Sequence, residues 1–403
     1  MSNKPLPVLP GAYDSTRASA RSGSESFRAE LPLLPGATLG ILGGGQLGRM
    51  FTIAARTMGY RIMVLDPDAA SPAGQMADVH VRADYTDHAA LKQLGAACAA
   101  VTTEFENVPA ASLIELANHC RVSPGADAVA IVQDRGHEKT WLADNGFATA
   151  PFALVNSEAD LDAALAATGT PALLKVSRFG YDGKGQARIN TPGDARAAFR
   201  EFGGQPCVLE GFVRLEREVS VVLARDDAGQ CALFPVAENR HENGILDVSI
   251  VPARVPDSLA DRAREMARAV AGKLGYVGVM AVEFFVANGR LMVNEIAPRP
   301  HNSGHYTLDA CVTDQFEQQV RALAGLPLGD TRLLSPVVMV NILGDRWRNG
   351  GPHWDTLLAH PAVKLHLYGK EAARPGRKMG HFNVLDADPE AALKLAEQMR
   401  DAL

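Results

Sequence analysis

The sequence predicts an α/β protein of more than one domain, and three observations indicate it. At 403 residues, with 47% apolar and 21% charged residues, the chain can build two or three domains with sizeable cores. From residue 37 to 131, short apolar runs alternate with amphipathic stretches, which is typical of a doubly wound parallel sheet. Later in the chain, two β-runs joined by an Asn-Gly turn indicate an antiparallel sheet.

Composition excludes some classes of function. A net charge of −6 gives no basic surface for nucleic acid. No apolar run reaches the roughly 18 residues that a membrane helix needs. The five cysteines are odd in number and form no CxxC motif, so we expect reduced thiols and a cytoplasmic location. Residues 1–36 are rich in Ser, Pro, Ala and Arg without hydrophobic periodicity, and we expect a disordered tail without a secretory signal.

A glycine-rich turn opens the first predicted domain, residues 37–131. The strand Thr38–Leu42 leads into GGGQLG at residues 43–48, a helix follows, and Asp66 ends the next strand. This GxGxxG spacing is the dinucleotide fingerprint, but alone it predicts only backbone amides that face an anion at a helix N-terminus. We expect the turn to hold the substrate side of a site, and a nicotinamide-dependent oxidoreductase stays as a distant alternative.

The second predicted domain, residues 132–212, carries a glycine-rich segment between two strands. Lys175 lies near the end of the first strand, and FGYDGKGQ, residues 179–186, follows it. Such a loop can cover triphosphate oxygens with its amides, although a flexible hairpin turn would look the same. The segment is not a Walker A loop, because it lacks GxxxxGK[ST] and leads into a strand.

The third predicted domain, residues 213–403, contains a hairpin with two carboxylates in apolar strands. Glu283 and Glu295 lie in the runs 279–286 and 290–296. A three-residue loop with Gly289 as a left-handed bulge would place both glutamates and Val293 on one face, and we expect this register. The pair then indicates a cation held between the two carboxylates. The alternative is an ordinary hairpin whose glutamates point into solvent.

Two local expectations complete the pass along this domain. His241 lies in the polar stretch ENRHENGIL, which we interpret as a loop in which a lone histidine is more often a bystander. A helix over residues 258–274 is predicted to begin with a capping box of Ser258 and Asp261.

Six motifs occur in an order that resembles one enzyme family. They are GILGGGQLGRM, TTEFENVP, QDRGHEKTWL, FGYDGKGQ, ENRHENGIL and NEIAPRPHNSGHYT. Together they resemble the 5-(carboxyamino)imidazole ribonucleotide synthetases, ATP-grasp ligases of purine biosynthesis, from about residue 39 to residue 380. The resemblance implies a three-domain ATP-grasp fold in which the central domain, a small α+β unit, forms the lid and the C-terminal domain is α+β. It also implies ATP with two Mg²⁺ ions, and a homodimer. One departure is Phe179, where many relatives have glycine.

The resemblance also implies roles for individual residues. Tyr181, Asp182, Lys175 and His305 would be catalytic, and Glu283 and Glu295 would hold magnesium. The ATP site would comprise Arg135, Lys175, Gly180, Tyr181, Asp182, Gly183, Lys184, Gly185, Gln186, Glu210, Gly211, Phe212, Val213, Glu218, His241, Asn294 and Glu295. The ribonucleotide would contact Gly45, Gln46, Leu47, Arg299, Asn302, Ser303, Lys370 and Arg377.

The implied reaction phosphorylates bicarbonate with ATP and transfers the carboxyl group to the amine of 5-aminoimidazole ribonucleotide. Either Asp182 or His305 could take the amine proton. A related purine ligase, formate-dependent glycinamide ribonucleotide formyltransferase, is the near alternative. A non-catalytic nucleotide-binding regulator is a third, and the presence of Lys175, Glu283 and Glu295 argues against it.

Overall fold

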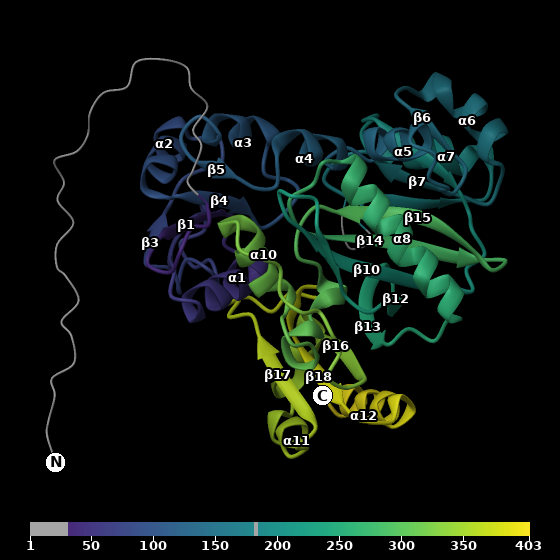
Figure 1. Ribbon diagram of the computed structural model, residues 1–403. Helices are drawn as coiled ribbons and strands as arrows, with labels where there is room; N and C mark the ends of the chain where they lie inside the picture. Colours follow the sequence, from purple (N-terminus) through teal and green to yellow (C-terminus); the bar gives the residue numbers. More distant parts are fainter. Residues whose placement is uncertain (1–30, 181–183) are drawn as a thin grey trace, which may run out of the picture.

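The computed structural model describes residues 31–180 and 184–403, which form three β-sheets flanked by helices (Figure 1). The helices of the described residues are α1 (Gln46–Thr57), α2 (His88–Ala97), α3 (Ala110–Leu116), α4 (Ala126–Val132), α5 (Arg135–Asp144), α6 (Leu161–Thr168), α7 (Pro192–Glu201), α8 (Asp257–Lys273), α9 (Thr307–Ala310), α10 (Gln315–Ala324), α11 (Trp354–Leu358) and α12 (Pro389–Ala402). Three 3-10 segments accompany them, η1 (Glu158–Asp160), η2 (Asn302–Gly304) and η3 (Gly344–Gly350).

The first sheet confirms the doubly wound prediction. Its strands are β1 (Thr38–Leu42), β2 (Arg61–Leu65), β3 (Val79–Val81), β4 (Ala100–Thr103) and β5 (Arg121–Val122). They are all parallel in the order β3-β2-β1-β4-β5, so the chain reverses its direction of winding at β1. Helices α2 and α3 pack on one face of the sheet, and α1 packs on the other.

Helix α10 comes from the C-terminal part of the chain, yet it completes this first core. Phe316, Val320 and Leu323 of α10 are buried against α1 and the apolar face of β1 and β2. Figure 1 shows α10 beside α1. One face of the N-terminal sheet therefore depends for part of its cover on a helix about 250 residues further along the chain.

The second sheet is small and antiparallel. Its strands are β6 (Phe152–Val155), β7 (Ala172–Val176), β8 (Gln186–Ile189) and β9 (Cys207–Gly211), in the order β6-β9-β7-β8. Helices α6 and α7 supply the apolar side chains that cover it. Capping boxes of Ser157 with Asp160 and of Thr191 with Asp194 start the segments that lead into these helices.

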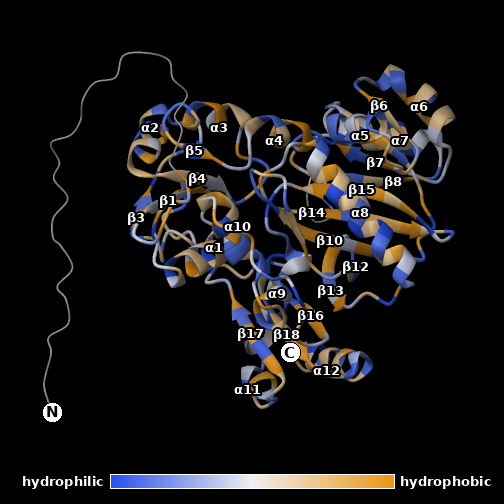
Figure 2. Cartoon of the chain, in the orientation of Figure 1, coloured by the Kyte–Doolittle hydropathy of each residue, from blue (hydrophilic) through white to orange (hydrophobic). Residues whose placement is uncertain are grey.

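The third sheet carries most of the C-terminal half. Its strands are β10 (Arg217–Arg225), β11 (Cys231–Leu233), β12 (Ala237–Glu242), β13 (Ile245–Val251), β14 (Gly278–Ala287), β15 (Arg290–Ala297), β16 (Val337–Leu343), β17 (Val363–Leu367) and β18 (Lys378–Leu385). The order is β15-β14-β10-β12-β13-β16-β18-β17, and β11 pairs with β10. Helix α8 covers one end and α12 the other. In Figure 2 the strands beneath α8 are largely hydrophobic, whereas α8 carries hydrophilic residues along its length.

The hairpin β14–β15 brings the two glutamates together by a different route from the one predicted. Asn288 and Gly289 have φ angles of +50° and +65°, and Ala287 pairs with Arg290, so the turn has two residues and not three. The bulge lies further along, at Asn294, because Phe284 pairs with Val293 while Glu283 pairs with Glu295. Val293 is therefore buried with Phe284, away from the glutamates, and that part of the expectation was wrong.

Three other expectations need correction. Residues 31–36 are not disordered: the Leu33 N–H donates to the Ala324 carbonyl at 2.8 Å, and the Tyr60 hydroxyl donates to the Leu33 carbonyl at 2.7 Å. His241 lies in strand β12 and not in a loop, because it pairs with Leu246 of β13 in the ladder. Helix α8 begins at Asp257 after Pro256, and its first turn has no side-chain cap.

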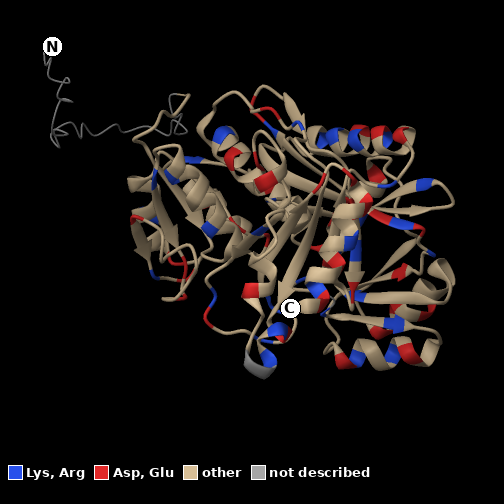
Figure 3. Ribbon diagram, turned by 90° about the horizontal axis from the view of Figure 1, so that it is seen from below, with Lys and Arg blue, Asp and Glu red and all other residues tan. Residues whose placement is uncertain are grey.

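The surface agrees with the charge balance of the sequence. Figure 3 shows acidic and basic residues interspersed over the helices and loops. Among the described residues, no helix combines the length and the apolar character needed to span a bilayer.

The packing at Gly40 gives a test of the first core. A Cβ atom at Gly40, in the central strand β1, would lie 2.9 Å from Val101 Cγ2 and 3.0 Å from Cys98 Sγ. We expect Gly40→Ala to destabilise the protein by about 1–3 kcal/mol through overpacking. The control is Gly272→Ala in α8, where a Cβ meets nothing within 4 Å; helix propensity predicts a gain of up to about 1 kcal/mol. Thermal unfolding of the two variants should shift in opposite directions, and equal shifts would contradict this account.

Candidate active site

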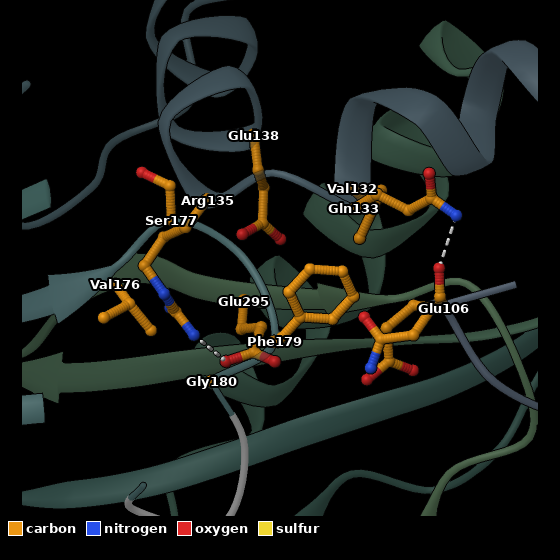
Figure 4. A pocket seen from close by; sticks show the side chains of 11 residues that line it. Glu106, Val132, Gln133, Arg135, Glu138, Val176, Ser177, Phe179, Gly180 and Glu295 are labelled. Carbon is orange, nitrogen blue, oxygen red and sulfur yellow. Dashed lines mark hydrogen bonds and ion pairs between the residues drawn. The ribbon is translucent and has the colours of Figure 1, made fainter. Parts of the chain in front are cut away.

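A cleft lies where the first sheet, helix α5 and strands β7 and β15 meet (Figure 4). It encloses about 370 Å³ of space that is open to solvent. Its walls are formed by Glu106, Asn107, Val132, Gln133, Arg135, Glu138, Val176, Ser177, Phe179, Gly180 and Glu295. The charged side chains among them come from segments up to 190 residues apart, so folding has assembled them here.

A buried carboxylate at one side of the cleft is surrounded by three cations. The ammonium of Lys175 donates to Glu210 Oε2 at 2.9 Å, Lys139 Nζ lies 3.7 Å from the same oxygen, and Arg135 Nη1 lies 3.9 Å from Oε1. Lys175 on β7 and Glu210 on β9 are diagonal neighbours across the ladder, because Leu173 pairs with Glu210. Burial raises the pKa of Glu210, but Lys175, Lys139 and Arg135 outweigh it and hold this pKa at about 2.

The cations exceed the charge of Glu210, and Arg135 also reaches Glu295. Arg135 Nη2 lies 3.2 Å from Glu295 Oε2, and Figure 4 shows this pair across the cleft. Although burial lowers the pKa of Arg135, Glu295 and Glu210 raise it further, so the guanidinium stays charged. The family resemblance places both Lys175 and Arg135 in the ATP site, and the structure brings these two residues together. A group of cations with a partial counter-charge suits a polyphosphate.

The facing carboxylates Glu283 and Glu295 are suited to a divalent cation. Asn294 Nδ2 lies 3.5 Å from Glu283 Oε2, and His301 Nε2 lies 3.2 Å from Glu283 Oε1. Burial, and then the charge of Glu295, raise the pKa of Glu283. No described group of three or more His, Cys, Asp or Glu side chains forms a closed metal site. Two carboxylates with open positions match Mg²⁺, which keeps water and phosphate oxygens as its other ligands.

Behind Glu283 a chain of buried polar side chains fixes the ring of His301. The Ser303 hydroxyl lies 2.8 Å from His301 Nδ1 and 2.7 Å from the Ser220 hydroxyl. The Ser220 hydroxyl in turn accepts from Asn239 Nδ2 at 2.9 Å. Burial holds the pKa of His301 well below its usual value, so the ring is neutral. Because Nδ1 accepts from Ser303, Nε2 carries the proton and donates it toward Glu283.

Three residues assigned to the substrate end are buried supports in this structure. Ser303 belongs to the chain just described, and Asn302 exchanges two hydrogen bonds with Asn341, at 3.0 and 2.7 Å. The side chain of His305 is fully buried, with Nδ1 lying 3.0 Å from Gln315 Nε2. Burial lowers the pKa of His305 well below its usual value. None of the three lines the cleft as described.

The glycine-rich turn after β1 has its amides occupied by side chains of the protein. The Gly44 N–H donates to Asp66 Oδ2 at 2.7 Å, and the Glu104 carboxylate accepts from the Gly45 N–H and, at 3.2 Å, from the Leu47 N–H. Burial raises the pKa of Glu104 to about 7. Asp66 is therefore part of the turn and not a ribose ligand. The sequence predicted that residues 102–107 lie at the carboxyl end of a strand, where parallel sheets bind ligands, but it assigned Glu104 no role.

Among the basic residues of the C-terminal domain, Lys370 lies beside this turn. The Lys370 ammonium donates to Gln46 Oε1, and this contact joins two predicted ribonucleotide residues that are 324 positions apart in the chain. The same ammonium donates to the Lys378 carbonyl at 2.8 Å. The Arg377 guanidinium donates to the Ala372 carbonyl at 2.8 Å within its own exposed loop. Arg299 forms an ion pair with Glu106, a cleft residue of the same stretch 102–107 that was also assigned no role. Burial raises the pKa of Glu106, but Arg299 lowers it further.

The remaining nucleotide residues flank the second sheet and the polar face of the third. Gly211 ends β9, Val213 is half-buried, and the ring of Phe212 stacks under Arg188, whose Cζ lies 4.6 Å from the ring centroid. His241 Nδ1 lies 2.6 Å from Glu218 Oε2, so these two predicted residues are paired.

The glycine-rich segment is described only at its two ends. Gly180 lines the cleft, Lys184 and Gly185 follow the gap, and Gln186 pairs with Lys175 in the ladder of β7 and β8. Tyr181, Asp182 and Gly183 lie outside the described residues. Phe179 has a φ of +61°, which is uncommon for a residue other than glycine.

Comparison with known families agrees with this architecture segment by segment. Residues 36–133 match the ribonucleotide synthetase preATP-grasp domain, residues 140–316 match the ATP-grasp domain, and residues 337–395 match the phosphoribosylaminoimidazole carboxylase C-terminal domain. These matches cover each of the three sheets.

Whole-length relatives extend the agreement. The chain is 48% identical over 352 residues to the N5-carboxyaminoimidazole ribonucleotide synthase of Brucella melitensis, covering 87% of this chain and 96% of the relative. It is 44% identical over 356 residues to the synthase of Bacillus subtilis, covering 88% and 92%.

Solved structures show the same fold. An ADP complex of N5-carboxyaminoimidazole ribonucleotide synthetase has a TM-score of 0.87 at 44% identity, covering 91% of this chain and 97% of that one. The Aspergillus clavatus synthase in complex with ADP and 5-aminoimidazole ribonucleotide has a TM-score of 0.84 at 31% identity, covering 91% and 98%. This chain therefore belongs to the N5-carboxyaminoimidazole ribonucleotide synthase family of ATP-grasp ligases.

Proposed function

We propose that this protein uses ATP and bicarbonate to carboxylate the amine of 5-aminoimidazole ribonucleotide, with release of ADP and phosphate, in purine biosynthesis. The observation that carries the proposal, in a chain of this family, is the ion pair of Arg135 with Glu295 in the cleft. Arg135 shares the partner Glu210 with Lys175, and Glu295 pairs with Glu283 in the ladder. Its relatives are named for that product, and one was solved with ADP and the aminoimidazole substrate.

On the ATP side, cations and backbone amides position the phosphates. Lys175 and Arg135 would contact phosphate oxygens, and the glycine-rich segment that begins at Gly180 would cover them. Glu283, Glu295 and Asn294 would hold two Mg²⁺ ions, which would neutralise charge on the transferred phosphoryl group. Glu218 and His241 would face the ribose, and residues 210–213 the adenine. Catalysis of this step is then mainly positioning and charge stabilisation.

On the acceptor side, carboxyphosphate must react with the amine before water hydrolyses it. Carboxyphosphate forms when a bicarbonate oxygen attacks the γ-phosphorus of ATP, and its carboxyl group then passes to the amine, which loses a proton. The complete burial of His305 disfavours it as the group that takes this proton. Asp182 thus becomes our candidate for the base, with Tyr181 beside it at the bicarbonate end. Closure of the lid would exclude water.

The ribonucleotide would lie over the turn of residues 45–47. Lys370, held beside Gln46, and the half-buried Arg377 would bind its phosphate, and Arg299 would face the same end. The occupation of the turn's amides by Asp66 and Glu104 speaks against a dinucleotide phosphate there, and so against the oxidoreductase alternative. We further propose that the enzyme acts in the cytoplasm as a homodimer.

The choice of acceptor can be tested by following ADP release. We expect turnover to require Mg²⁺ and bicarbonate, and to rise when 5-aminoimidazole ribonucleotide is added. Formate with glycinamide ribonucleotide should give no turnover in bicarbonate-free buffer. Turnover with that second pair would show that the protein is instead a formyl-transferring ligase.

The two phosphate sites can be separated by replacing one cation in each. Arg377→Ala should raise KM for 5-aminoimidazole ribonucleotide about tenfold or more and leave KM for ATP nearly unchanged, because a charge-assisted contact contributes about 1.5–3 kcal/mol. Lys175→Ala should raise KM for ATP or abolish turnover. Steady-state kinetics with each substrate varied in turn measures both effects. An unchanged KM for the ribonucleotide in Arg377→Ala would return Arg377 to the role of a surface residue.

The raised pKa of Glu283, about 7, makes magnesium affinity depend on pH. Protons compete with Mg²⁺ for this carboxylate, so the apparent Kd should rise up to about tenfold per pH unit below that pKa. Without the metal, a folded-state pKa above the unfolded value means that stability falls as pH rises through this range. Mg²⁺ should therefore raise Tm more at about pH 8 than at about pH 6, as measured by thermal unfolding. A rise in Tm that is the same at both values would contradict the assignment.

A further inference from the structure

Strand β15 carries Glu295 at the edge of the third sheet, where only one side of the strand is paired in the ladder. Its partner on that side is β14, and the bulge at Asn294 interrupts the pairing there. An unpaired edge exposes backbone N–H and C=O groups, and a bulge adds to them. The hydrogen-bond partners of these backbone groups therefore determine the direction of the Glu295 side chain.

Helix α5 and the chain after it supply the missing partners. The Val293 N–H donates to the Ala148 carbonyl at 2.7 Å. The Lys139 ammonium donates to the Asn294 carbonyl at 2.8 Å, and the Ile296 N–H donates to Glu138 Oε1 at 2.5 Å. The two side-chain contacts therefore lie on the residues directly before and after Glu295.

Both side chains are buried, which is costly for ionisable groups without a specific partner. The exposed fraction is 2% for Glu138 and 0% for Lys139. Arg135, Glu138 and Lys139 are spaced i, i+3 and i+4, so one face of α5 presents all three to the strand. Arg135 contacts the carboxylate of Glu295 itself, while its neighbours contact the backbone.

We propose that Glu138 and Lys139 are positioning residues that hold the backbone on both sides of Glu295, so that its carboxylate faces Glu283 in the geometry that a divalent cation requires. This inference rests on the proposed function, because it takes the Glu283 and Glu295 pair as the magnesium site. It extends that function by assigning a supporting role to two residues that the family resemblance left without one.

Helix α5 also links this support to the nucleotide side. The Arg135 N–H, at the start of the helix, donates to the Ser177 carbonyl at 2.8 Å, directly after β7 and before the glycine-rich segment. The Lys139 ammonium lies 3.7 Å from Glu210 on β9. One short helix thus contacts the strand before the lid, the cation cluster and the metal strand.

Metal binding measured apart from turnover tests the proposal. Mn²⁺, whose free form is counted by electron paramagnetic resonance, serves as the probe in the presence of ADP. Glu138→Leu removes the acceptor for the Ile296 N–H, and Lys139→Met removes the donor to the Asn294 carbonyl. Each should raise the Kd for Mn²⁺ by about 10–100-fold, as expected for a support behind a metal ligand. Glu138→Gln keeps an acceptor oxygen and should stay within about threefold.

Three controls separate the possible causes. Glu265→Leu, at an exposed position of α8, makes the same change of side chain away from the site and should leave the Kd unchanged. Tm is measured for every variant, and weaker Mn²⁺ binding by Glu138→Leu with a folded protein, restored in Glu138→Gln, supports the proposal. If Glu138→Leu does not fold, the proposal is tested by comparing the Kd for Mn²⁺ of Lys139→Met with that of the parent protein.

Glu283→Gln and Glu295→Gln distinguish the two levels of inference. If both abolish Mn²⁺ binding while Glu138→Leu and Lys139→Met bind it as the parent does, the positioning role is overturned and the magnesium site stands. If Glu283→Gln and Glu295→Gln bind Mn²⁺ normally, the metal site itself is wrong, and the positioning role is overturned with it.

Discussion

The whole site depends on the buried interaction of Glu210 with Lys175, Lys139 and Arg135. Lys175 lies on β7, whereas Arg135 and Lys139 lie on α5. All three nevertheless lie within 4 Å of the Glu210 carboxylate. Burying so many charges is unfavourable unless they are paired, and here the pairing leaves positive charge in excess. Under the proposed function, that excess would attract a polyphosphate, and the same helix that supplies Arg135 and Lys139 contacts the strand with Glu295. Phosphate binding and metal binding would then share one support.

Much of this could be predicted from local patterns. The alternation of strands and helices over residues 37–131 was sufficient for the doubly wound sheet, because parallel strands with helical crossovers have few other solutions. Caps such as Asp134 and Asp314, whose side chains accept from the first turns of α5 and α10, were recognisable because capping is a local interaction. The order of six motifs then indicated the family.

What could not be predicted depends on contacts between distant segments. The turn at Asn288 follows its local sequence, but the bulge at Asn294 forms on an edge whose partners come from α5, some 155 residues earlier. The strand β12 was hidden because Asn239 and His241 face a polar site and not an apolar core, so the usual alternation is absent. Likewise, no pattern could show that His305 is enclosed by Phe316, Tyr368 and His381, because these side chains come from three other elements.

The contribution of α10 to the first core has a consequence for synthesis of the chain. When the ribosome has made residues 37–131, the apolar face of β1 and β2 that α10 will cover has no partner beyond α1. Phe316, Val320 and Leu323 leave the exit tunnel only after the central sheet and most of the third sheet have been made. The first domain must therefore wait, with exposed apolar surface, for almost the entire polypeptide. A nascent chain of this protein should thus be a client of chaperones that shield such surface until translation is nearly complete.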